Sequence, residues 1–331
     1  MSDSQPQGSA QLDLQEPKGP AAQLECGVLW FLHVCKTGGT TVKDFLKYDV
    51  HRSERNDWRL VNLMSSPCDP KLAAEDMGDW TQSARWSVAD EELRRERPKL
   101  MVHQHSCSPG MGAHLLPQLQ ALNATLQRRS GGRCRVALTT VLRRPADLLK
   151  SSIFFNGVPP DAMRDFVTTR ADYQIKYLQH GGPIARWPAT IKATPATPEL
   201  RRAATATLSH FELVGRTEDL GAFVTRLAGL LGVTPPGGGG GGGVGGSGNA
   251  TTSGDGAPAN AVALGAEAEA TGPMLGHAHS DARKNRAYEL SADDRFWMHQ
   301  HLVADEWLYG RTFDGVAGGV AAWPQPSVSL A

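Results

Sequence analysis

The chain has 331 residues, 40% of them hydrophobic, which is enough for one large domain or two small ones with a buried core. Its 34 basic and 34 acidic residues give a formal net charge of zero. That balance excludes a global basic field of the kind that attracts nucleic acid, so any attraction for a polyanion has to be local. The local candidates are the arginine-rich segments 94–99, 128–135 and 283–286, and a solvated surface is the simpler interpretation of the first two.

The cysteines and the hydropathy bear on two questions: whether the protein holds a metal, and whether it has a membrane segment. The five cysteines are Cys26, Cys35, Cys68, Cys107 and Cys134. They form neither a CxxC pair nor a Cys/His spacing typical of a metal site, so no metal is expected, while disulfide pairing stays open. The first 25 residues are polar, without a signal-peptide core, and no apolar run of 18 residues occurs, so the sequence alone predicts a soluble protein.

Composition divides the chain into five parts. Residues 1–26 have the composition of a disordered tail, and residues 27–233 form the main domain. Residues 234–278 form a Gly/Ala-rich insert with seven consecutive glycines, which has too few apolar residues to bury a core and is expected to be flexible. Residues 279–314 regain aromatic and charged residues and are expected to dock back onto the domain, before a last tail at 315–331.

Four apolar segments in the main domain are typical of buried strands. They cover residues 28–34, 100–102 with their flanks, 136–142 and 211–215. Apolar residues with helical spacing follow two of these segments. After the first segment they are Val42, Phe45 and Leu46, and after the fourth they are Leu220, Phe223, Val224, Leu227 and Leu231. This alternation predicts an α/β fold, a P-loop-like three-layer sandwich with a central parallel sheet flanked by helices. In such folds the ligand lies at the carboxyl ends of the strands.

The first strand end carries the residues of an anion site. Two glycines allow a tight turn, the next helix presents free N–H groups, and a lysine and three threonines surround them. These residues are Lys36, Thr37, Gly38, Gly39, Thr40 and Thr41. Because the lysine precedes the glycines, the segment is not a Walker A loop, and it suits a single phosphate. The alternative is a glycine turn without a ligand.

A second phosphate site is predicted at the end of the third strand. Arg143 stands at the strand end, Pro145 suits the first turn of a helix, and Ser151 lies about 9 Å along that helix. Arg143 and Ser151 together could hold one phosphate, with the arginine bidentate. The alternative is a strand–helix junction with a solvated arginine pair, Arg143 and Arg144.

Two histidines, His103 and His105, follow the second strand. Alternate residues of an extended segment face the same side, so both imidazoles can point into one cleft. Histidine suits the base that takes a proton from an attacking hydroxyl, and we expect His105 to be that base and His103 its partner or orienter. A zinc pair, for which further ligands are lacking, and two ordinary surface histidines are the alternatives.

These motifs carry a resemblance to a known family. The segment 31–41 resembles the 5′-phosphosulfate loop of Golgi carbohydrate sulfotransferases, which include the heparan sulfate 2-O- and 6-O-sulfotransferases. The Arg143–Ser151 spacing resembles their 3′-phosphate motif, and the histidine pair resembles the His-x-His of the 2-O enzymes. The chain departs from the family pattern at Cys35, where proline is usual, and at Arg144, where aspartate is frequent.

The resemblance implies 3′-phosphoadenylyl sulfate (PAPS) as co-substrate, without a metal. Lys36 and its loop would then hold the 5′-phosphosulfate and stabilise the leaving phosphate, while Arg143 and Ser151 would hold the 3′-phosphate. Residues 280–285 resemble the loop that closes over this cofactor, with Arg283 and Lys284 as further contacts.

Three more segments have structural interpretations. Residues 173–178 resemble an acceptor-side segment of the family, but core packing is the simpler interpretation. Thr217 or Asp219 is expected to cap the helix that follows the fourth strand. One helix containing Phe296, Trp297, His301, Leu302, Asp305, Leu308 and Tyr309 is expected to act as a lid or brace.

The resulting hypothesis is sulfuryl transfer from PAPS to a hydroxyl of a carbohydrate, a glycosaminoglycan-like polysaccharide, with a weak indication of the 2-O position of a uronic acid. Two alternatives are kept: a catalytically inactive module that binds PAPS or another anion, and a P-loop nucleotide kinase. The resemblance implies membrane association and a lumenal Golgi location, whereas the chain itself, without a visible anchor, leaves the cytoplasm open.

Overall fold

The computed structural model describes residues 22–53, 56–63, 91–105, 110–181, 187, 189–235 and 292–313. Nearly all of the expected insert, most of the first tail, and the two predicted cofactor contacts Arg283 and Lys284 lie outside these residues.

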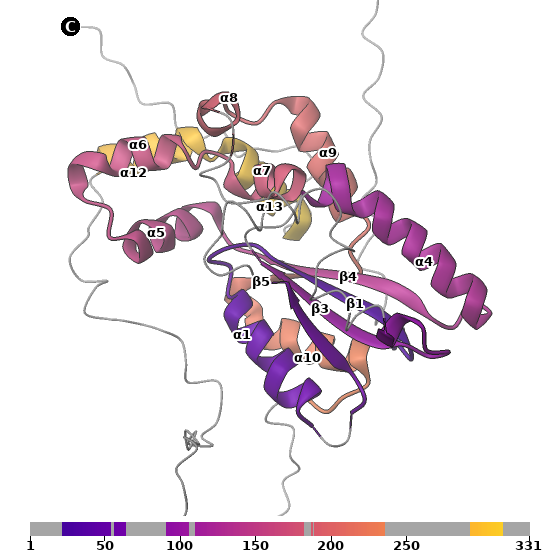
Figure 1. The fold of residues 1–331 in the computed structure, drawn as a ribbon. Coiled ribbons are helices and arrows are strands. Elements are labelled where there is room, and N and C mark those ends of the chain that lie inside the picture. Colours follow the sequence, from indigo (N-terminus) through magenta and orange to yellow (C-terminus); the bar gives the residue numbers. More distant parts are fainter. Residues whose placement is uncertain are drawn as a thin grey trace, which may run out of the picture.

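The centre of the fold is a parallel five-stranded sheet with the order β2-β3-β1-β4-β5 (Figure 1). The strands are β1 (Gly27–His33), β2 (Arg59–Leu63), β3 (Lys99–His105), β4 (Arg135–Leu142) and β5 (Leu213–Arg216). Because all neighbours are parallel, every carboxyl end lies at the same edge of the sheet. The predicted α/β sandwich with a parallel sheet between helices is confirmed.

The helices connect the strands and cover both faces of the sheet (Figure 1). Before β5 they are α1 (Gly39–Asp44), η1 (Phe45–His51), η3 (Met111–Leu115), α4 (Leu116–Ser130), α5 (Pro145–Asn156), η4 (Pro160–Ala162), α6 (Met163–Thr168), α7 (Tyr173–His180), α8 (Ala189–Ala193) and α9 (Pro198–Leu208). After β5 come η6 (Thr217–Asp219), α10 (Leu220–Leu231), α12 (Ala292–His301) and α13 (Val303–Phe313). Pro145 begins α5, as predicted.

Side-chain alternation along β1 builds two separate cores. Trp30 and Leu32 pack with the helices on one face, which include α4, α7, α9 and α13. Leu29 and Phe31 pack on the other face, against α1, η1 and α10. Because β1 is buried along its whole length, it reads as a continuous apolar run. The expected core packing of residues 173–178 is confirmed, since all six are buried in α7.

Three differences from the expected elements matter for the site. The residues His103 to His105 do not follow the second predicted strand but form the end of β3 itself. A fifth strand, β2, was not predicted and pairs with β3 at the edge of the sheet. The expected single C-terminal helix is two helices, α12 and α13, separated at Leu302.

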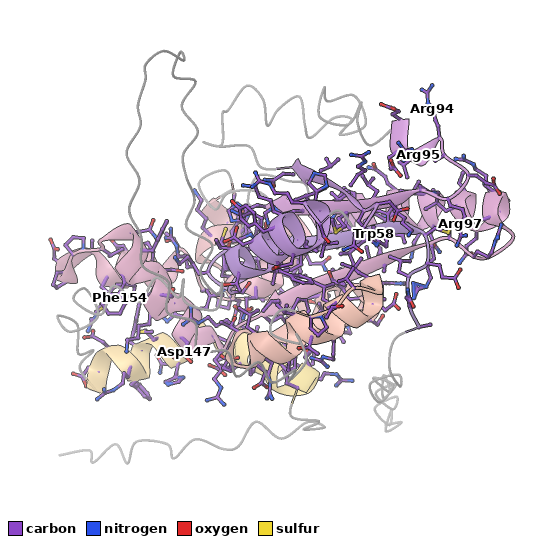
Figure 2. The ribbon with its side chains drawn as sticks, turned by 90° about the horizontal axis from the view of Figure 1, so that it is seen from below. Trp58, Arg94, Arg95, Arg97, Asp147 and Phe154 are labelled. Carbon is purple, nitrogen blue, oxygen red and sulfur yellow. A yellow bond between two sulfur atoms is a disulfide. The ribbon has the colours of Figure 1, made fainter. Side chains whose placement is uncertain are left out.

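The amino ends of the strands lie away from the predicted site. A disulfide joins Cys26 to Cys134, immediately before β1 and β4, and spans 108 residues. The basic residues Arg94, Arg95 and Arg97 lie at this end, far from α5 (Figure 2). Arg95 pairs with Glu92 and Arg97 with Glu25, so part of this charge is neutralised locally.

Candidate functional site

The loop from β1 to α1 makes a tight turn at Gly38, which has the left-handed φ of 82° and precedes the first helical residue. A side chain at Gly38 would also meet Leu220 at 3.0 Å, and one at Gly39 would collide with the imidazole of His33. The Thr41 N–H donates to the Gly38 carbonyl oxygen at 3.1 Å, whereas the N–H groups of Gly39 and Thr40 precede the first such acceptor and can face an anion.

The predicted loop residues contribute unequally. The Thr37 hydroxyl is buried and donates to the carbonyl oxygen of Val34 at 2.7 Å, so it holds the turn and has no proton left for a phosphate. Thr40 is exposed and Thr41 half-buried, and both lie in the first turn of α1. We therefore assign the loop's hydroxyl donors to Thr40 and Thr41.

Lys36 is half-buried and has a left-handed backbone with φ of 66°. Its ammonium lies 3.7 Å from the ring centroid of Phe155 on α5, a cation–π contact. Phe155 itself is 73% exposed. Burial, and after it the nearby charge of Arg143, lower the pKa of Lys36. The aromatic ring thus holds the ammonium against the exposed end of α5.

Arg143 brings the second predicted phosphate site to the first. Its strand β4 lies directly beside β1, with Leu32 opposite Thr140. At the carboxyl ends, the Arg143 guanidinium donates a hydrogen bond to the Lys36 carbonyl oxygen at 3.1 Å. Ser151 lies in the second turn of α5 and is half-buried. This contact agrees with the expectation that Lys36 and Arg143 share one edge of the sheet.

Gln174 on α7, which is 1% exposed, fixes the backbone of Arg143. Its side-chain oxygen accepts from the Arg143 N–H at 3.0 Å, and its amide nitrogen donates to the Arg143 carbonyl oxygen at 2.9 Å. A buried amide bonded at both ends has one orientation, so Gln174 sets the direction in which Arg143 leaves the strand. The sequence alone leaves the role of this segment open.

Two buried aspartates hold the helices behind Arg143. Asp172 accepts hydrogen bonds from the N–H groups of Ala304 and Asp305 at the start of α13. Asp305 in turn accepts from the N–H groups of Gln174 and Ile175 at the start of α7, both at 2.9 Å. Each helix is therefore capped by a carboxylate from the other. Burial, and then the neighbouring Asp172, raise the pKa of Asp305 to about 8.

Thr217, directly after β5, contacts the loop after β1 and the end of β4. Its hydroxyl lies 2.8 Å from the Thr37 carbonyl oxygen and 3.2 Å from that of Leu142. Of the two expected caps, Asp219 stands at the N-cap position of α10 but makes no side-chain cap hydrogen bond. The Thr217 hydroxyl instead bridges the loop after β1 and the end of β4.

The histidines form a cluster larger than predicted. His33, the last residue of β1, is in register with His105, and its ring centroid lies 4.1 Å from that of His105. His33 Nδ1 is 3.0 Å from His103 Nε2, and His103 Nδ1 is 2.7 Å from Asn62 Oδ1 on β2. His105 Nε2 lies 3.7 Å from the Cys35 thiol. His103 is fully buried and His105 half-buried, so of this predicted pair His105 is the more accessible.

Burial keeps these imidazoles neutral. It lowers the pKa of His105 to about 4, with a smaller contribution from the charge of Lys43. It also lowers the pKa of His103 to about 3, with His105 and Lys43 as lesser causes. The neutral imidazole is the form that a general base requires.

Sequence reasoning missed His33, Asn62 and Gln174. His33 lies within the segment that carries the family resemblance, and its only signal is its position one step before the loop, facing the same side as His103 once β1 and β3 are paired. Asn62 has no signal because β2 was not predicted.

In the part of the chain that the structure describes, no group of three or more His, Cys, Asp or Glu side chains is arranged to hold a metal ion.

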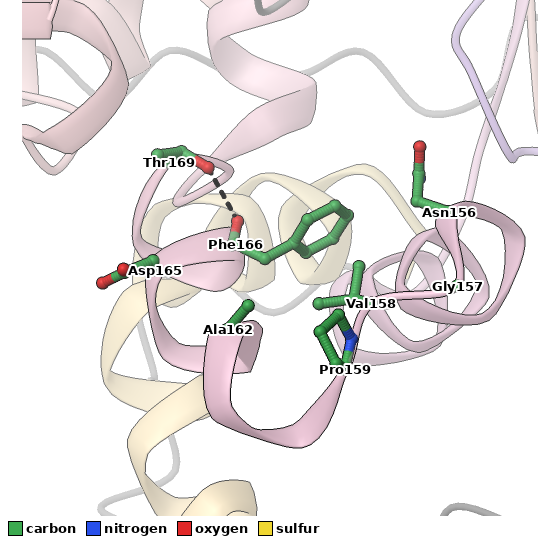
Figure 3. Close-up of a pocket in the computed structure, with 8 residues that line it drawn as sticks. All are labelled: Asn156, Gly157, Val158, Pro159, Ala162, Asp165, Phe166 and Thr169. Carbon is green, nitrogen blue, oxygen red and sulfur yellow. Dashed lines mark hydrogen bonds between the residues drawn. The ribbon is translucent and has the colours of Figure 1, made fainter.

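A shallow apolar hollow lies at the end of α5, between that helix and α6 (Figure 3). It has a volume of about 420 Å³ and is lined by Asn156, Gly157, Val158, Pro159, Ala162, Asp165, Phe166 and Thr169. The Arg170 guanidinium lies 3.5 Å from the Phe166 ring centroid. Among the described helices, none is long and apolar enough to cross a membrane.

Comparison with known proteins gives only weak likenesses. No protein-family model matches the chain, and no curated protein matches it in sequence. Among solved structures, a sulfotransferase from Alicyclobacillus acidocaldarius matches with a TM-score of 0.32 and 11% identity, over 62% of this chain and 81% of that one. A retinol dehydratase in complex with retinol and PAP matches with a TM-score of 0.31 and 12% identity, over 67% and 64% of the two chains. Likeness at this level does not identify a function.

Proposed function

We propose that this chain is a sulfotransferase that moves a sulfuryl group from PAPS to a hydroxyl. The observation that carries the proposal is the contact of Arg143 with the Lys36 loop across neighbouring strands. It makes one site with two separate cationic groups, each suited to a monophosphate. PAPS has that distribution of charge, with a 3′-phosphate at one end and a 5′-phosphosulfate at the other. The triphosphate of ATP, which a kinase would need, has all its phosphates in one chain.

The proposed reaction is an in-line displacement at sulfur. His105 takes the proton of the acceptor hydroxyl while the acceptor oxygen forms a bond to sulfur and the bond from sulfur to the 5′-phosphate oxygen breaks. The negative charge left on that phosphate oxygen is stabilised by Lys36 and by the N–H groups at the start of α1. For this the ammonium moves from the Phe155 ring to the phosphate, exchanging a cation–π contact for a full opposite charge.

The acceptor and the compartment are part of the same proposal. The resemblance of the motifs favours a carbohydrate hydroxyl on a glycosaminoglycan-like polysaccharide, with the 2-O position of a uronic acid first among the candidates. A lumenal Golgi location agrees with the Cys26–Cys134 disulfide, because disulfides persist in oxidising compartments.

A second candidate is a module that binds PAPS without transferring sulfate. It is favoured by the Cys35 thiol, which lies 3.7 Å from His105 Nε2 and thereby occupies the nitrogen that the reaction needs. Proline, which is usual at this position in the family that the loop resembles, has no such group.

The test is transfer of labelled sulfate from PAPS to a panel of desulfated polysaccharides. We expect transfer by the wild type and loss of transfer in His105→Ala, with binding of adenosine 3′,5′-bisphosphate (PAP) retained in both. His210→Ala is the matched control, because His210 is exposed and lies on the loop before β5. Binding of PAP without transfer to any acceptor would favour the inactive module, and absence of PAP binding would refute both candidates.

A further inference from the structure

Arg170 carries a positive charge that the proposed reaction does not use. It lies in the turn between α6 and α7, with its guanidinium 3.5 Å from the ring centroid of Phe166. One of its N–H groups is 3.5 Å from the Thr169 hydroxyl oxygen, a long hydrogen bond. Neither contact neutralises the charge, and within the described ranges of the chain no acidic side chain forms an ion pair with Arg170.

This charge is partly removed from water. The Arg170 side chain is half-buried, and burial lowers its pKa, while the nearby Tyr173 and Cys35 partly offset that effect. The Tyr173 phenol supplies no negative charge, because burial raises its own pKa well above the usual value. An arginine stays protonated throughout the physiological range, so the guanidinium remains a half-buried cation. Such a group is stabilised when an anion pairs with it.

Arg170 is close to two parts of the site. Both of its side-chain contacts, Phe166 and Thr169, line the hollow at the end of α5 (Figure 3). The guanidinium also interacts electrostatically with Cys35, whose thiol lies 3.7 Å from His105 Nε2. It is therefore near both the hollow and the histidine that is the proposed base. An anion bound by Arg170 at this place would belong to the acceptor.

The hollow suits one face of a sugar ring. Val158, Pro159 and Phe166 give it apolar walls, and the Asp165 carboxylate points away from the Phe166 ring (Figure 3). A pyranose ring has an apolar face of C–H groups and a polar edge. Apolar walls beside one cation therefore fit a ring that carries a single acidic substituent.

The helix α5 connects this hollow to the Lys36 loop. Phe155 directly precedes Asn156, a residue of the hollow, and its ring contacts the Lys36 ammonium at 3.7 Å. When the ammonium moves to the leaving phosphate, as the proposed reaction requires, the 73% exposed Phe155 side chain is free for the acceptor. A chain of sugar rings can then extend from the hollow to the reacting hydroxyl.

We propose that Arg170 binds the carboxylate of an acidic sugar of the acceptor, with the sugar ring against Phe166, and so selects acidic over neutral polysaccharides. The inference rests on the proposed function, because the acceptor is the molecule whose hydroxyl His105 deprotonates. One edge of a guanidinium can hold both oxygens of a carboxylate. The sulfate of PAPS is also an anion, so the experiment has to separate the acceptor from the donor.

The test compares two forms of one acceptor. The probes are a desulfated polysaccharide that contains uronic acid and the methyl ester of the same polysaccharide, which has no carboxylate charge and gains no hydroxyl. Calorimetry on the PAP-bound protein measures binding without depending on transfer. We expect the wild type to bind the acid form roughly tenfold or more tightly than the ester, since hydrogen bonds between charged groups are among the stronger ones.

Arg170→Gln should lose this preference and bind the two forms with affinities within about threefold of each other. Arg170→Lys, which keeps the charge but loses the bidentate contact, should lie between Arg170→Gln and the wild type. The matched control is Arg164→Gln, because Arg164 is an exposed residue of α6 whose guanidinium lies 6.0 Å from the Trp297 ring centroid. This control should keep the preference of the wild type for the acid form.

PAP affinity is measured for each variant and reports on both folding and the donor site. It should stay within about threefold of the wild type in Arg170→Gln. A tenfold loss of PAP affinity in that variant would overturn the inference, because it would assign Arg170 to the donor. An equal preference for the acid form in the wild type and in Arg170→Gln would overturn it as well.

The fate of the proposed function is read separately, from the transfer of labelled sulfate. Transfer by a wild type that binds the acid form and the ester equally, or that does not bind the acid form, would refute the role of Arg170 and leave the proposed function intact. An Arg170-dependent preference without transfer would support the inference and favour the inactive module. Failure of the wild type to bind PAP would remove the proposed function and this inference together.

Discussion

The Arg143 guanidinium donates to the Lys36 carbonyl oxygen at 3.1 Å, which joins the end of β4 to the loop after β1. The two residues are 107 positions apart in the chain. Because this bond is made by one edge of the guanidinium, other N–H groups of Arg143 remain available to a ligand. A change at Arg143 is therefore expected to affect both the 3′-phosphate and the shape of the loop.

Arg143→Lys should weaken the binding of PAP by roughly tenfold to a hundredfold, because lysine cannot make the bidentate contact of arginine with a phosphate. Adenosine 5′-phosphosulfate, which lacks the 3′-phosphate, should be affected far less. Calorimetry with both ligands separates the two contributions, and Arg144→Lys, at an exposed neighbour, is the control. An equal loss for both ligands would mean that Arg143 acts only through the loop.

Lys36→Met should reduce the rate of sulfuryl transfer roughly 100- to 1,000-fold, the size of effect seen when one donor to a developing negative charge is removed. Methionine keeps much of the contact with Phe155 but has no charge for the leaving phosphate. The measurement is kcat with saturating PAPS. The control is Lys150→Met, at an exposed position on α5, the helix that also carries Phe155. An unchanged kcat with a raised KM for PAPS would assign Lys36 to binding alone.

The pKa of His105, lowered to about 4 mainly by burial, predicts the acidic side of the pH–rate profile. A general base works in its deprotonated form, so His105 stays active as pH falls until the pH approaches 4. We expect kcat/KM to show no loss attributable to this group between about pH 8 and pH 5. A fall with a midpoint near 6.5, the ordinary pKa of the side chain, would indicate that the base is an exposed histidine and not His105.

Burial of neutral His103 links stability to pH. Its pKa is about 3 in the folded protein, against 6.5 for the free side chain, so below pH 6.5 the unfolded chain binds a proton that the folded chain does not. The wild type therefore loses stability as pH falls from 6.5 toward 3. Relative to His103→Gln, its free energy of unfolding should drop by about 1.4 kcal/mol per pH unit in that range. Urea denaturation of both proteins at pH 6 and pH 4 measures this; a constant difference would contradict it.

Asp305→Ala should destabilise the protein by about 2–5 kcal/mol, because it leaves the N–H groups of Gln174 and Ile175 buried without acceptors. Gln174 also makes two hydrogen bonds to the backbone of Arg143. The folded fraction of the variant should therefore bind PAP with lower affinity than the wild type. Denaturation and calorimetry on the same samples check both effects. Val303→Ala, at an exposed position of the same helix α13, controls for disturbance of the helix.

The parts of the fold that depend on local pattern could be predicted from the sequence. The strands β1 and β4 are apolar runs that end in turn residues, and parallel pairing then requires Lys36 and Arg143 to lie at one edge. The strand β2 was not predicted, because Arg59–Leu63 is short, contains a charged and a polar residue, and forms the edge of the sheet. The place of His33 in the histidine cluster depends on the register that places it opposite His105, and register is a property of two segments that no single segment encodes.

The exchange of caps between α7 and α13 has a consequence for the synthesis of the chain. Residues 172–175 leave the ribosome about 130 positions before Ala304 and Asp305, so the start of α7 lacks its acceptors until α13 has been made. A nascent or C-terminally shortened chain thus lacks the carboxylate that fixes Gln174 behind Arg143. Tight binding of a nucleotide would therefore require α13, so a chain in which α13 is not yet made would lack it.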